Sequence, residues 1–270
     1  MPNALDNALL RRSLGISCLL AVITFLTFDL TELDRAISDL FYNPASQSFV
    51  LEHDRLFERV THQWARMIPG LFTSLALATA MLAGVAALLE LRGAQALRSL
   101  AQRARILPLL ALAHRHVRDA LFFLVAFALS ATAVHYLKSH TSVYCPVETT
   151  LYGGSQAHVR WFENFNAFSK PGAGRCWPGG HASGAFSLMA LYFIALRYQW
   201  RHARQVLWLT LGLGLLFGTT RVLQGWHYMS HTFWAGLIVW WCTAFTAWAF
   251  YARTARRNAS EAHGLHEPVR

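Results

Sequence analysis

The sequence predicts an all-α fold, a polytopic membrane protein built as a six-transmembrane helix bundle. Hydrophobic residues make up 54% of the 270 residues and charged residues only 14%, which is too apolar a composition for an ordinary soluble domain. Six long runs of the chain contain no charged residue. When these runs cross a membrane in alternate directions, lysine and arginine gather on one side of it, as is typical of membrane proteins.

The six charge-free runs define the expected spans. A straight helix needs roughly 20 residues to cross the hydrocarbon core, so the shorter runs need polar ends or a tilt within the bundle. We expect one membrane-embedded domain over residues 1–252 and a disordered cytoplasmic tail over residues 253–270. The spans are expected near residues 13–30, 67–91, 119–137, 181–198, 205–220 and 231–252.

The charge distribution predicts the orientation of the chain. With the N-terminus in the cytoplasm, 15 of the 24 lysine and arginine residues lie inside, together with 5 of the 14 acidic residues. The net charge of +10 then falls entirely on the cytoplasmic side. No basic run is interleaved with exposed aromatic residues, so the charge does not indicate a nucleic-acid partner. The first run lacks the cleavage pattern of a signal peptide, and we expect it to remain as a span.

Three segments between the spans have distinct patterns. Residues 31–66 place apolar residues at helical spacing, which favours short amphipathic helices on the outer membrane surface. The inside loop over residues 92–118 contains an apolar piece that is too short to span, and we expect it to extend the neighbouring helices into the cytoplasm. Residues 138–181 form the longest outer loop, and long loops held on a rigid scaffold are where sites usually lie.

Four side chains at the ends of these spans predict a site at the outer face. Lys138 ends the third run, His181 opens the fourth after a Gly-Gly turn, Arg221 ends the fifth, and His227 precedes the sixth. Together they supply the charge neutralisation, the nucleophile and the acid that phosphoryl transfer needs. Taken singly, each has a structural interpretation, since a lysine at a span end is often a snorkelling anchor and a lone histidine a core residue.

The order and spacing of these residues resemble the membrane branch of the type 2 phosphatidic acid phosphatase and vanadium haloperoxidase superfamily. That family carries the motifs K-x-x-x-x-x-x-R-P, P-S-G-H and S-R-x-x-x-x-x-H-x-x-x-D. The resemblance extends over nearly the whole chain, because it includes the layout of six spans. The residues that match are Lys138 and Pro146 in the first motif, Pro178, Gly180 and His181 in the second, and Arg221 and His227 in the third.

The resemblance implies a role for each matching residue. His227 would attack phosphorus to form a phosphohistidine, while His181 would protonate the leaving oxygen and then activate water. No metal and no other cofactor is required, because fixed cations neutralise the phosphate. The groups implied to hold the phosphate oxygens are Lys138, Arg221 and the backbone N–H groups of Gly179 and Gly180.

Three residues depart from the family's motifs. Cys145 stands where the family has arginine, and losing a charge-assisted donor there costs on the order of 1.5–3 kcal/mol of phosphate binding unless another cation replaces it. Arg160 and Arg175 lie in the same loop and are the candidate replacements. Gly179 stands in place of serine, so a hydroxyl donor is lost while the backbone N–H remains.

The third departure is His231, which stands where the family has the aspartate that orients the nucleophilic histidine. His231 follows His227 by four residues, so the two share a face on a helical turn and a neutral ring at His231 can accept the hydrogen bond. Glu148 and Glu163 are the alternative orienting residues, brought in by the loop. A metal-binding histidine pair is the rival interpretation, but no third ligand has a recognisable spacing, and we expect no metal.

Two of the four cysteines lie next to motif prolines. Cys145 and Cys176 both fall outside the membrane, where a disulfide between the first two motif segments can form. The alternative is a pair of reduced, buried thiols. Cys18 and Cys242 lie within expected spans and are interpreted as packing residues.

The resemblance therefore implies an integral membrane phosphatase whose partner is a lipid phosphomonoester or diphosphate in the bilayer. The active site would face the periplasm or exterior from a cytoplasmic (inner) membrane. Two alternatives remain open: a lipid-to-lipid phosphotransferase, and a non-catalytic protein that binds or transports a phospholipid. The pattern identifies neither the lipid nor the oligomeric state.

Overall fold

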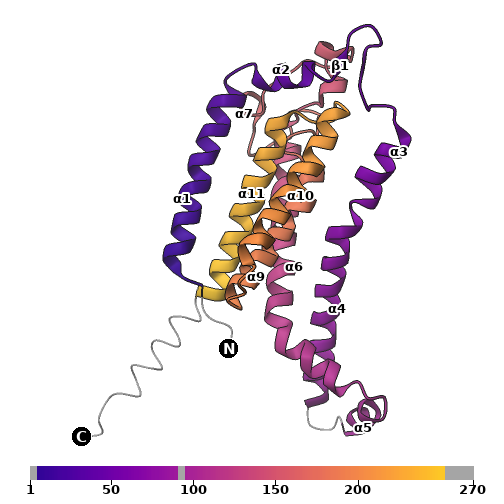
Figure 1. The fold of residues 1–270 in the computed structure, drawn as a ribbon, viewed down its shortest axis with the longest axis vertical. Helices are drawn as coiled ribbons and strands as arrows, with labels where there is room; N and C mark the ends of the chain where they lie inside the picture. The colour runs from indigo at the N-terminus through magenta and orange to yellow at the C-terminus, as the bar shows by residue number, and fades with distance from the viewer. Residues whose placement is uncertain (1–4, 91–94, 253–270) are drawn as a thin grey trace, which may run out of the picture.

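The computed structural model describes residues 5–90 and 95–252, and the expected cytoplasmic tail over residues 253–270 lies outside this range. The described chain is mostly helical, and its long helices run side by side as an elongated bundle (Figure 1). The all-α class is therefore confirmed. Five helical segments in the described chain are long and apolar enough to cross a membrane: Asn7–Asp29, Arg55–Glu90, Leu107–Glu148, Ala203–Leu223 and Met229–Ala252. The protein is a multi-pass membrane protein.

The helices that form these segments keep close to the expected ranges, with one exception. α6 begins at residue 107, because the short apolar piece of the inside loop continues into the third span, as the sequence indicated. The main helices of these segments are α1 (Asn7–Thr24) with the π-helix η1 (Phe25–Asp29), α4 (Met67–Glu90), α6 (Leu107–Thr141), α10 (Ala203–Leu223), and α11 (Met229–Ala247) with the π-helix η6 (Trp248–Ala252). The segment Arg55–Glu90 also includes two short helices that precede α4. The amphipathic helix α5 (Gln95–Arg103) lies at one end of the bundle, between α4 and α6 (Figure 1).

The predicted fourth span is not confirmed, because residues 180–197 form three short pieces. They are α8 (Gly180–Phe186), the 3₁₀ turn η5 (Ser187–Met189) and α9 (Ala190–Arg197). Ser183 and Ser187 each donate a side-chain hydrogen bond to the carbonyl three residues earlier. Such back-bonding competes with the helical ladder and bends helices. The interrupted segment nevertheless packs against α10 and α11 in the centre of the bundle.

A polar cluster joins α6 to its neighbours at one end of the bundle. At one end Asp119 accepts hydrogen bonds from Tyr198 at 2.7 Å and Tyr251 at 2.8 Å, and it also pairs with Arg197. The apolar core beside it contains Phe122 and Phe193. Ionisable groups within a membrane bundle are costly unless they are paired, so this cluster ties α6, α9 and η6 together.

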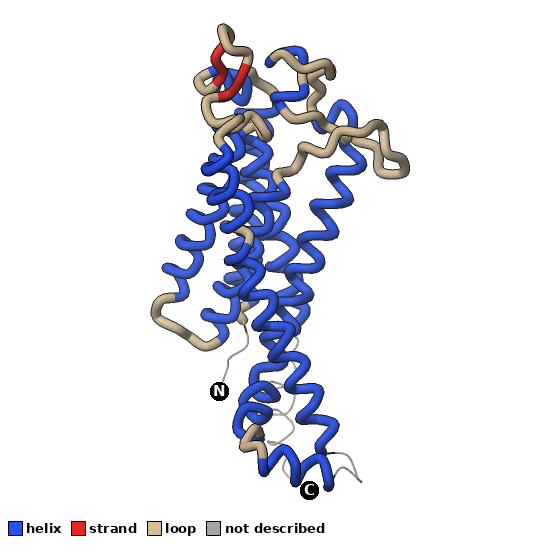
Figure 2. The backbone as a smooth tube through the Cα atoms, turned by 90° about the vertical axis from the view of Figure 1, so that its right-hand side faces the viewer, coloured by secondary structure: helices blue, strands red, loops and turns tan. Residues whose placement is uncertain are grey.

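The other end is covered by short elements. α2 (Leu33–Asp39), α3 (Arg55–Glu58) and the π-helix η2 (Arg59–Trp64) match the short helices expected over residues 31–66. Between them lies a hairpin of β1 (Tyr42–Asn43) and β2 (Ser48–Phe49), which the sequence did not indicate. Figure 2 shows these strands at the same end as most of the long loops. The loop before α8 adds the turns η3 (Pro146–Glu148) and η4 (Thr150–Tyr152) and the helix α7 (Trp161–Asn164).

Two glycines on one face of α10 allow the central helices to approach closely. A Cβ at Gly214 would collide with the ring of Phe186 on α8, and a Cβ at Gly218 would collide with Thr232 on α11. The spacing of four residues is the small-residue pattern by which membrane helices pack backbone to backbone. Gly212 on the same helix has no such neighbour within 4 Å.

We therefore predict that Gly214→Ala and Gly218→Ala each lower the thermal stability of the purified protein in detergent. Overpacking of this kind costs about 1–3 kcal/mol. Gly212→Ala is the matched control, and we expect it to be neutral or slightly stabilising because alanine favours the helix. Equal melting temperatures for all three variants would contradict the close packing of α10.

Candidate active site

Four helix ends bring the predicted side chains to the end of the bundle that carries α2 and the hairpin (Figure 1). Lys138 lies in the last turn of α6, His181 in the first turn of α8, Arg221 in the last turn of α10, and His227 just before α11. Burial lowers the pKa of His227 well below its usual value, and the nearby charges of Lys138 and Arg221 lower it further. The four predicted side chains thus lie at one end of the bundle, each at or beside the end of a helix.

Lys138 is held by the loop that leads into α8. Its Nζ donates to the carbonyl of Arg175 at 2.6 Å and lies 3.4 Å from the carbonyl of Cys176. A Cβ at Gly180 would lie 2.9 Å from Cε of Lys138, so the glycine leaves room for the lysine over the start of α8. These contacts join the first and second motifs directly.

The Gly-Gly turn makes one contact that departs from the prediction. The N–H of Gly179 donates to the carbonyl of His231 at 2.9 Å. This N–H is therefore occupied in the structure and is not free to bind phosphate. A Cβ at Gly179 would lie 3.0 Å from the same carbonyl, so a larger residue would fit only if the backbone shifted slightly.

Arg221 is a buried cation with a partner that the sequence did not indicate. Its Nη1 donates to Oε2 of Glu58 at 2.7 Å and to Oε1 of Gln224 at 2.8 Å. Gln224 in turn donates from Nε2 to the same carboxylate oxygen at 2.9 Å. The guanidinium also lies over the ring of Trp226, 5.6 Å from its centroid. Glu58 had no motif around it, and only its place in the amphipathic segment over residues 31–66 could have suggested it.

His181 is enclosed by the same segment, which lies within residues 31–66. Its Nε2 lies 2.7 Å from the carbonyl oxygen of Thr61, and because a carbonyl only accepts, this nitrogen carries a proton. The ring stacks between those of His62 and Phe217, with centroids at 4.6 Å and 5.0 Å. His62 is a further residue that the sequence did not single out.

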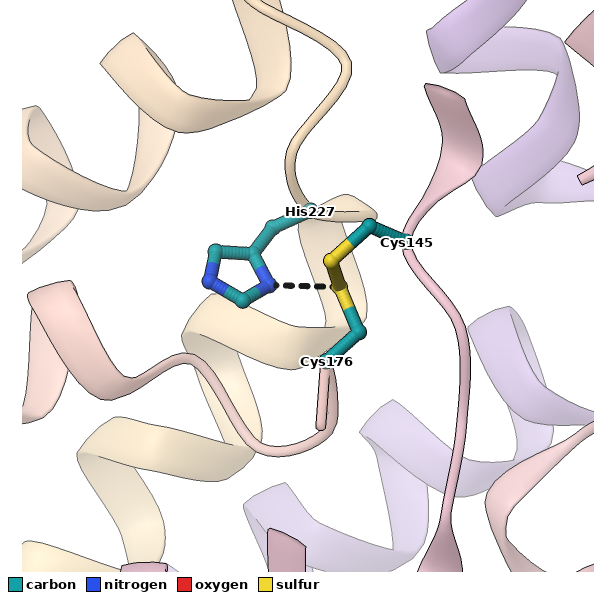
Figure 3. Close-up of side chains that lie close together, drawn as sticks. All are labelled: Cys145, Cys176 and His227. Carbon is teal, nitrogen blue, oxygen red and sulfur yellow. Dashed lines mark hydrogen bonds between the residues drawn. A yellow bond between two sulfur atoms is a disulfide. The ribbon is translucent and has the colours of Figure 1, made fainter. Parts of the chain in front are cut away.

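His227 lies against a disulfide. The structure joins Cys145 and Cys176, which are 5.1 Å apart at Cα. Figure 3 shows the imidazole of His227 pointing its Nδ1 at the sulfur of Cys176, 3.1 Å away. Nδ1 also lies 3.4 Å from Nδ1 of His231. With Nδ1 directed at these neighbours, Nε2 is the nitrogen left for a substrate. The remaining cysteines, Cys18 and Cys242, are free thiols.

The turn before α11 sets the position of His227. Gly225 adopts φ 71°, a left-handed conformation that side chains disfavour. At the helix itself, Oδ1 of Asp34 accepts from the N–H of Ser230 at 2.9 Å. This carboxylate on α2 therefore caps the first turn of α11, between the two histidines of the third motif. Asp34 and His231 line one polar pocket, together with His158 and Arg160.

The loop residues predicted as auxiliary groups have other partners. Arg160 forms an ion pair with Glu32 at 3.2 Å, and Arg175 donates to the carbonyls of Gly172 and Gly174. Glu148 accepts from the N–H of Cys145 at 2.7 Å, and Glu163 accepts from the N–H of Arg160 at 3.0 Å. Within the described ranges, neither glutamate hydrogen-bonds to His227, whose ring lies against Cys176 and His231. Arg175 contributes its carbonyl to Lys138, so its backbone rather than its charge lies at the site.

Cys145, Cys176 and His227 also bring potential metal-ligand atoms within 4.8 Å of one another. Metals bind cysteine as the thiolate, whereas these two sulfurs are bonded to each other. The cluster in Figure 3 is therefore explained by the disulfide and its contact with His227.

The disulfide generates a prediction about stability. It closes a loop with a sequence separation of 31 residues, and constraining the unfolded chain to that extent is worth about 3–4 kcal/mol. We expect Cys145→Ser to lower the melting temperature in detergent as much as the double variant with Cys176→Ser does. Cys18→Ser is the control and should melt like the wild type. A double variant that melts at a clearly lower temperature than Cys145→Ser would argue against a shared bond.

The cap on α11 generates a prediction about pH. Burial raises the pKa of Asp34 from 3.8 to about 6, so the folded protein favours the protonated side chain. The stability that this protonated form contributes is present at acid pH and is lost as pH rises through about 6. Asp34→Asn keeps an oxygen for Ser230 but cannot ionise. We expect the variant to exceed the wild type by about 1–3 kcal/mol at pH 7.5 and to match it near pH 4. Parallel melting curves across this range would contradict the burial of an ionised Asp34.

Comparison with known proteins agrees with this geometry. The model of the PAP2 superfamily matches residues 119–256, which is about half of the chain and includes all three motif segments. Searches of curated proteins and of solved structures returned no match. The matched region contains Lys138, His181, Arg221 and His227, the four residues that the fold gathers at one end of the bundle. The chain belongs to the PAP2 superfamily.

Proposed function

We propose that this protein is an integral membrane phosphatase that hydrolyses a lipid phosphomonoester or diphosphate at the outer face of the cytoplasmic membrane. The observation that carries the proposal is the convergence of two cations and two histidines from four helix ends at one end of the bundle. Membership of the PAP2 superfamily supports a phosphoric ester hydrolase. A site at the end of the spans suits a phosphate carried at the level of the lipid headgroups.

In the proposed first step, Nε2 of His227 attacks phosphorus, and an N–P bond forms as the P–O bond to the leaving group breaks. His181, whose protonated form is favoured by the anionic phosphate bound beside it, gives its proton to the leaving oxygen. In the second step neutral His181 takes a proton from water, whose oxygen attacks the phosphohistidine and releases phosphate and neutral His227. Lys138 and Arg221 neutralise the charge that the phosphoryl oxygens carry in both steps.

We also propose that α8, η5 and α9 cross the membrane together as a sixth span within a single domain over residues 1–252. Their 18 residues pack against α10 and α11. Because α8, η5 and α9 follow one another without a gap, a bend at η5 is enough to join them into one crossing. Six crossings place both ends of the chain in the cytoplasm and put the basic residues of the α4–α6 connection on the same side. The polar cluster around Asp119 then lies at the inner end and the histidine site at the outer end.

The first test is substitution of the two histidines. We predict that His227→Ala and His181→Ala each lower phosphate release from lipid phosphates by at least about 10³-fold, because each removes a group that bonds with the reacting atoms. His114→Ala, at an exposed position in the first turns of α6, is the matched control and should retain activity. A panel of phosphatidic acid, phosphatidylglycerol phosphate, undecaprenyl diphosphate and lipid A, read as released phosphate, measures all three variants. Full activity of either site variant would refute the mechanism.

The second test is the pH profile. Because burial holds the pKa of His227 well below 6.5, the nucleophile stays neutral in mildly acidic buffer. We therefore expect no loss of kcat/KM from protonation of His227 between pH 7.5 and 6.5. A covalent phosphate label that survives base and is lost in acid, as a phosphohistidine does, distinguishes nucleophilic catalysis from simple phospholipid binding. Products formed with two lipids present distinguish hydrolysis from phosphotransfer.

A further inference from the structure

One outer segment touches the functional atoms of two motifs. The segment Arg55–Trp64, formed by α3 and η2, brings the carboxylate of Glu58 to 2.7 Å from Nη1 of Arg221. Three residues later, the carbonyl of Thr61 lies 2.7 Å from Nε2 of His181. Both the guanidinium and the histidine are thus engaged by the same ten residues of the chain.

The chemistry of these contacts is that of a ligand. A guanidinium binds carboxylates and phosphates with the same N–H donors, so Glu58 occupies a donor of Arg221 that a phosphate oxygen would use. The carbonyl of Thr61 likewise accepts from the nitrogen of His181 proposed to exchange a proton with the leaving oxygen and with water. Glu58 therefore takes the place of the substrate phosphate at Arg221. The carbonyl of Thr61 takes the place of the leaving oxygen or water at His181.

The exposure of the Arg55–Trp64 segment allows it to move away from the site. Among residues 55–64 none is buried, and the side chain of Glu58 is 38% exposed although that of Arg221 is only 9% exposed. Segments with few buried contacts open at low free-energy cost. The segment is attached to the site by the carboxylate of Glu58, which accepts from Arg221 and Gln224, and by the contact and ring stacking at His181.

We propose that the Arg55–Trp64 segment fills the phosphate site of the resting protein, with Glu58 as an internal anion that a substrate phosphate must displace from Arg221. This inference rests on the proposed function, since it assumes that Arg221 binds phosphate. The apparent affinity for any phosphate is then the intrinsic affinity reduced by the fraction of molecules in which Glu58 has left. Glu58 is in this way an affinity-determining residue of the site.

The test is the affinity of the full-length protein in detergent for inorganic phosphate, measured by calorimetry for the wild type and for Glu58→Gln. The amide retains the shape of the side chain and loses the charge that competes with phosphate. We expect Glu58→Gln to bind phosphate about two- to fivefold more tightly, the range of a partly exposed ion pair. Glu52→Gln is the matched control: Glu52 lies in the same outer region, accepts from the N–H of Phe49 at 3.0 Å, and should leave affinity unchanged. Unchanged or weaker binding by Glu58→Gln overturns the proposal, because Glu58 then only supports Arg221.

A second measurement uses the wild type alone and does not depend on the folding of a variant. Hydrogen exchange of peptides that include residues 55–64 should become faster when inorganic phosphate saturates the site, because the segment is released. Slower or unchanged exchange overturns the displacement. Neither measurement requires turnover, so inactivity towards lipid phosphates would refute the proposed function while leaving the phosphate-binding result to be judged separately.

Discussion

The site depends on one covalent constraint, the disulfide between Cys145 and Cys176. It joins the chain just after α6 to the chain just before α8, so the first two motifs are held together whatever the long loop between them does. The backbone reinforces the bond, since the N–H of Cys176 donates to the carbonyl of Val143 at 2.7 Å. Because the sulfur of Cys176 also contacts His227, the same residue touches the third motif. The three motifs therefore meet at Cys176, which is fully buried.

Two departures from the family motifs, Cys145 and His231, compensate each other in charge. In the family pattern that the chain resembles, an arginine stands at position 145 and an aspartate at position 231. Cysteine and a neutral histidine remove one positive and one negative charge, so the net charge of the site is unchanged. His231 also makes two contacts at the site. Its carbonyl accepts from the N–H of Gly179, and its ring lies beside that of His227. The three departures from the motifs thus form one connected set of contacts.

Paired polar groups at both ends keep the bundle in register around this site. At the end that carries the site, Asp29 accepts hydrogen bonds from Trp161 at 3.0 Å and Trp234 at 2.8 Å, which ties η1, α7 and α11 together. At the other end Asp119 performs the same task for α6, α9 and η6. Buried carboxylates with several donors are stable only when every element is in place, so these clusters specify the helix arrangement. The glycines of α10 then set how closely α8 and α11 approach.

The sequence by itself determined the helical class, most helix positions and the identity of the motif residues. Those properties follow from local composition and spacing, because a span needs a long apolar run and a motif keeps its order in the chain. Tertiary structure alone decided the partners of these residues. Glu58 and Thr61 reach Arg221 and His181 across more than a hundred residues of chain, and no local pattern encodes such a contact. The same holds for Gly179, whose N–H was expected to face a ligand but instead meets a carbonyl of α11, because packing of two helix starts brings them together.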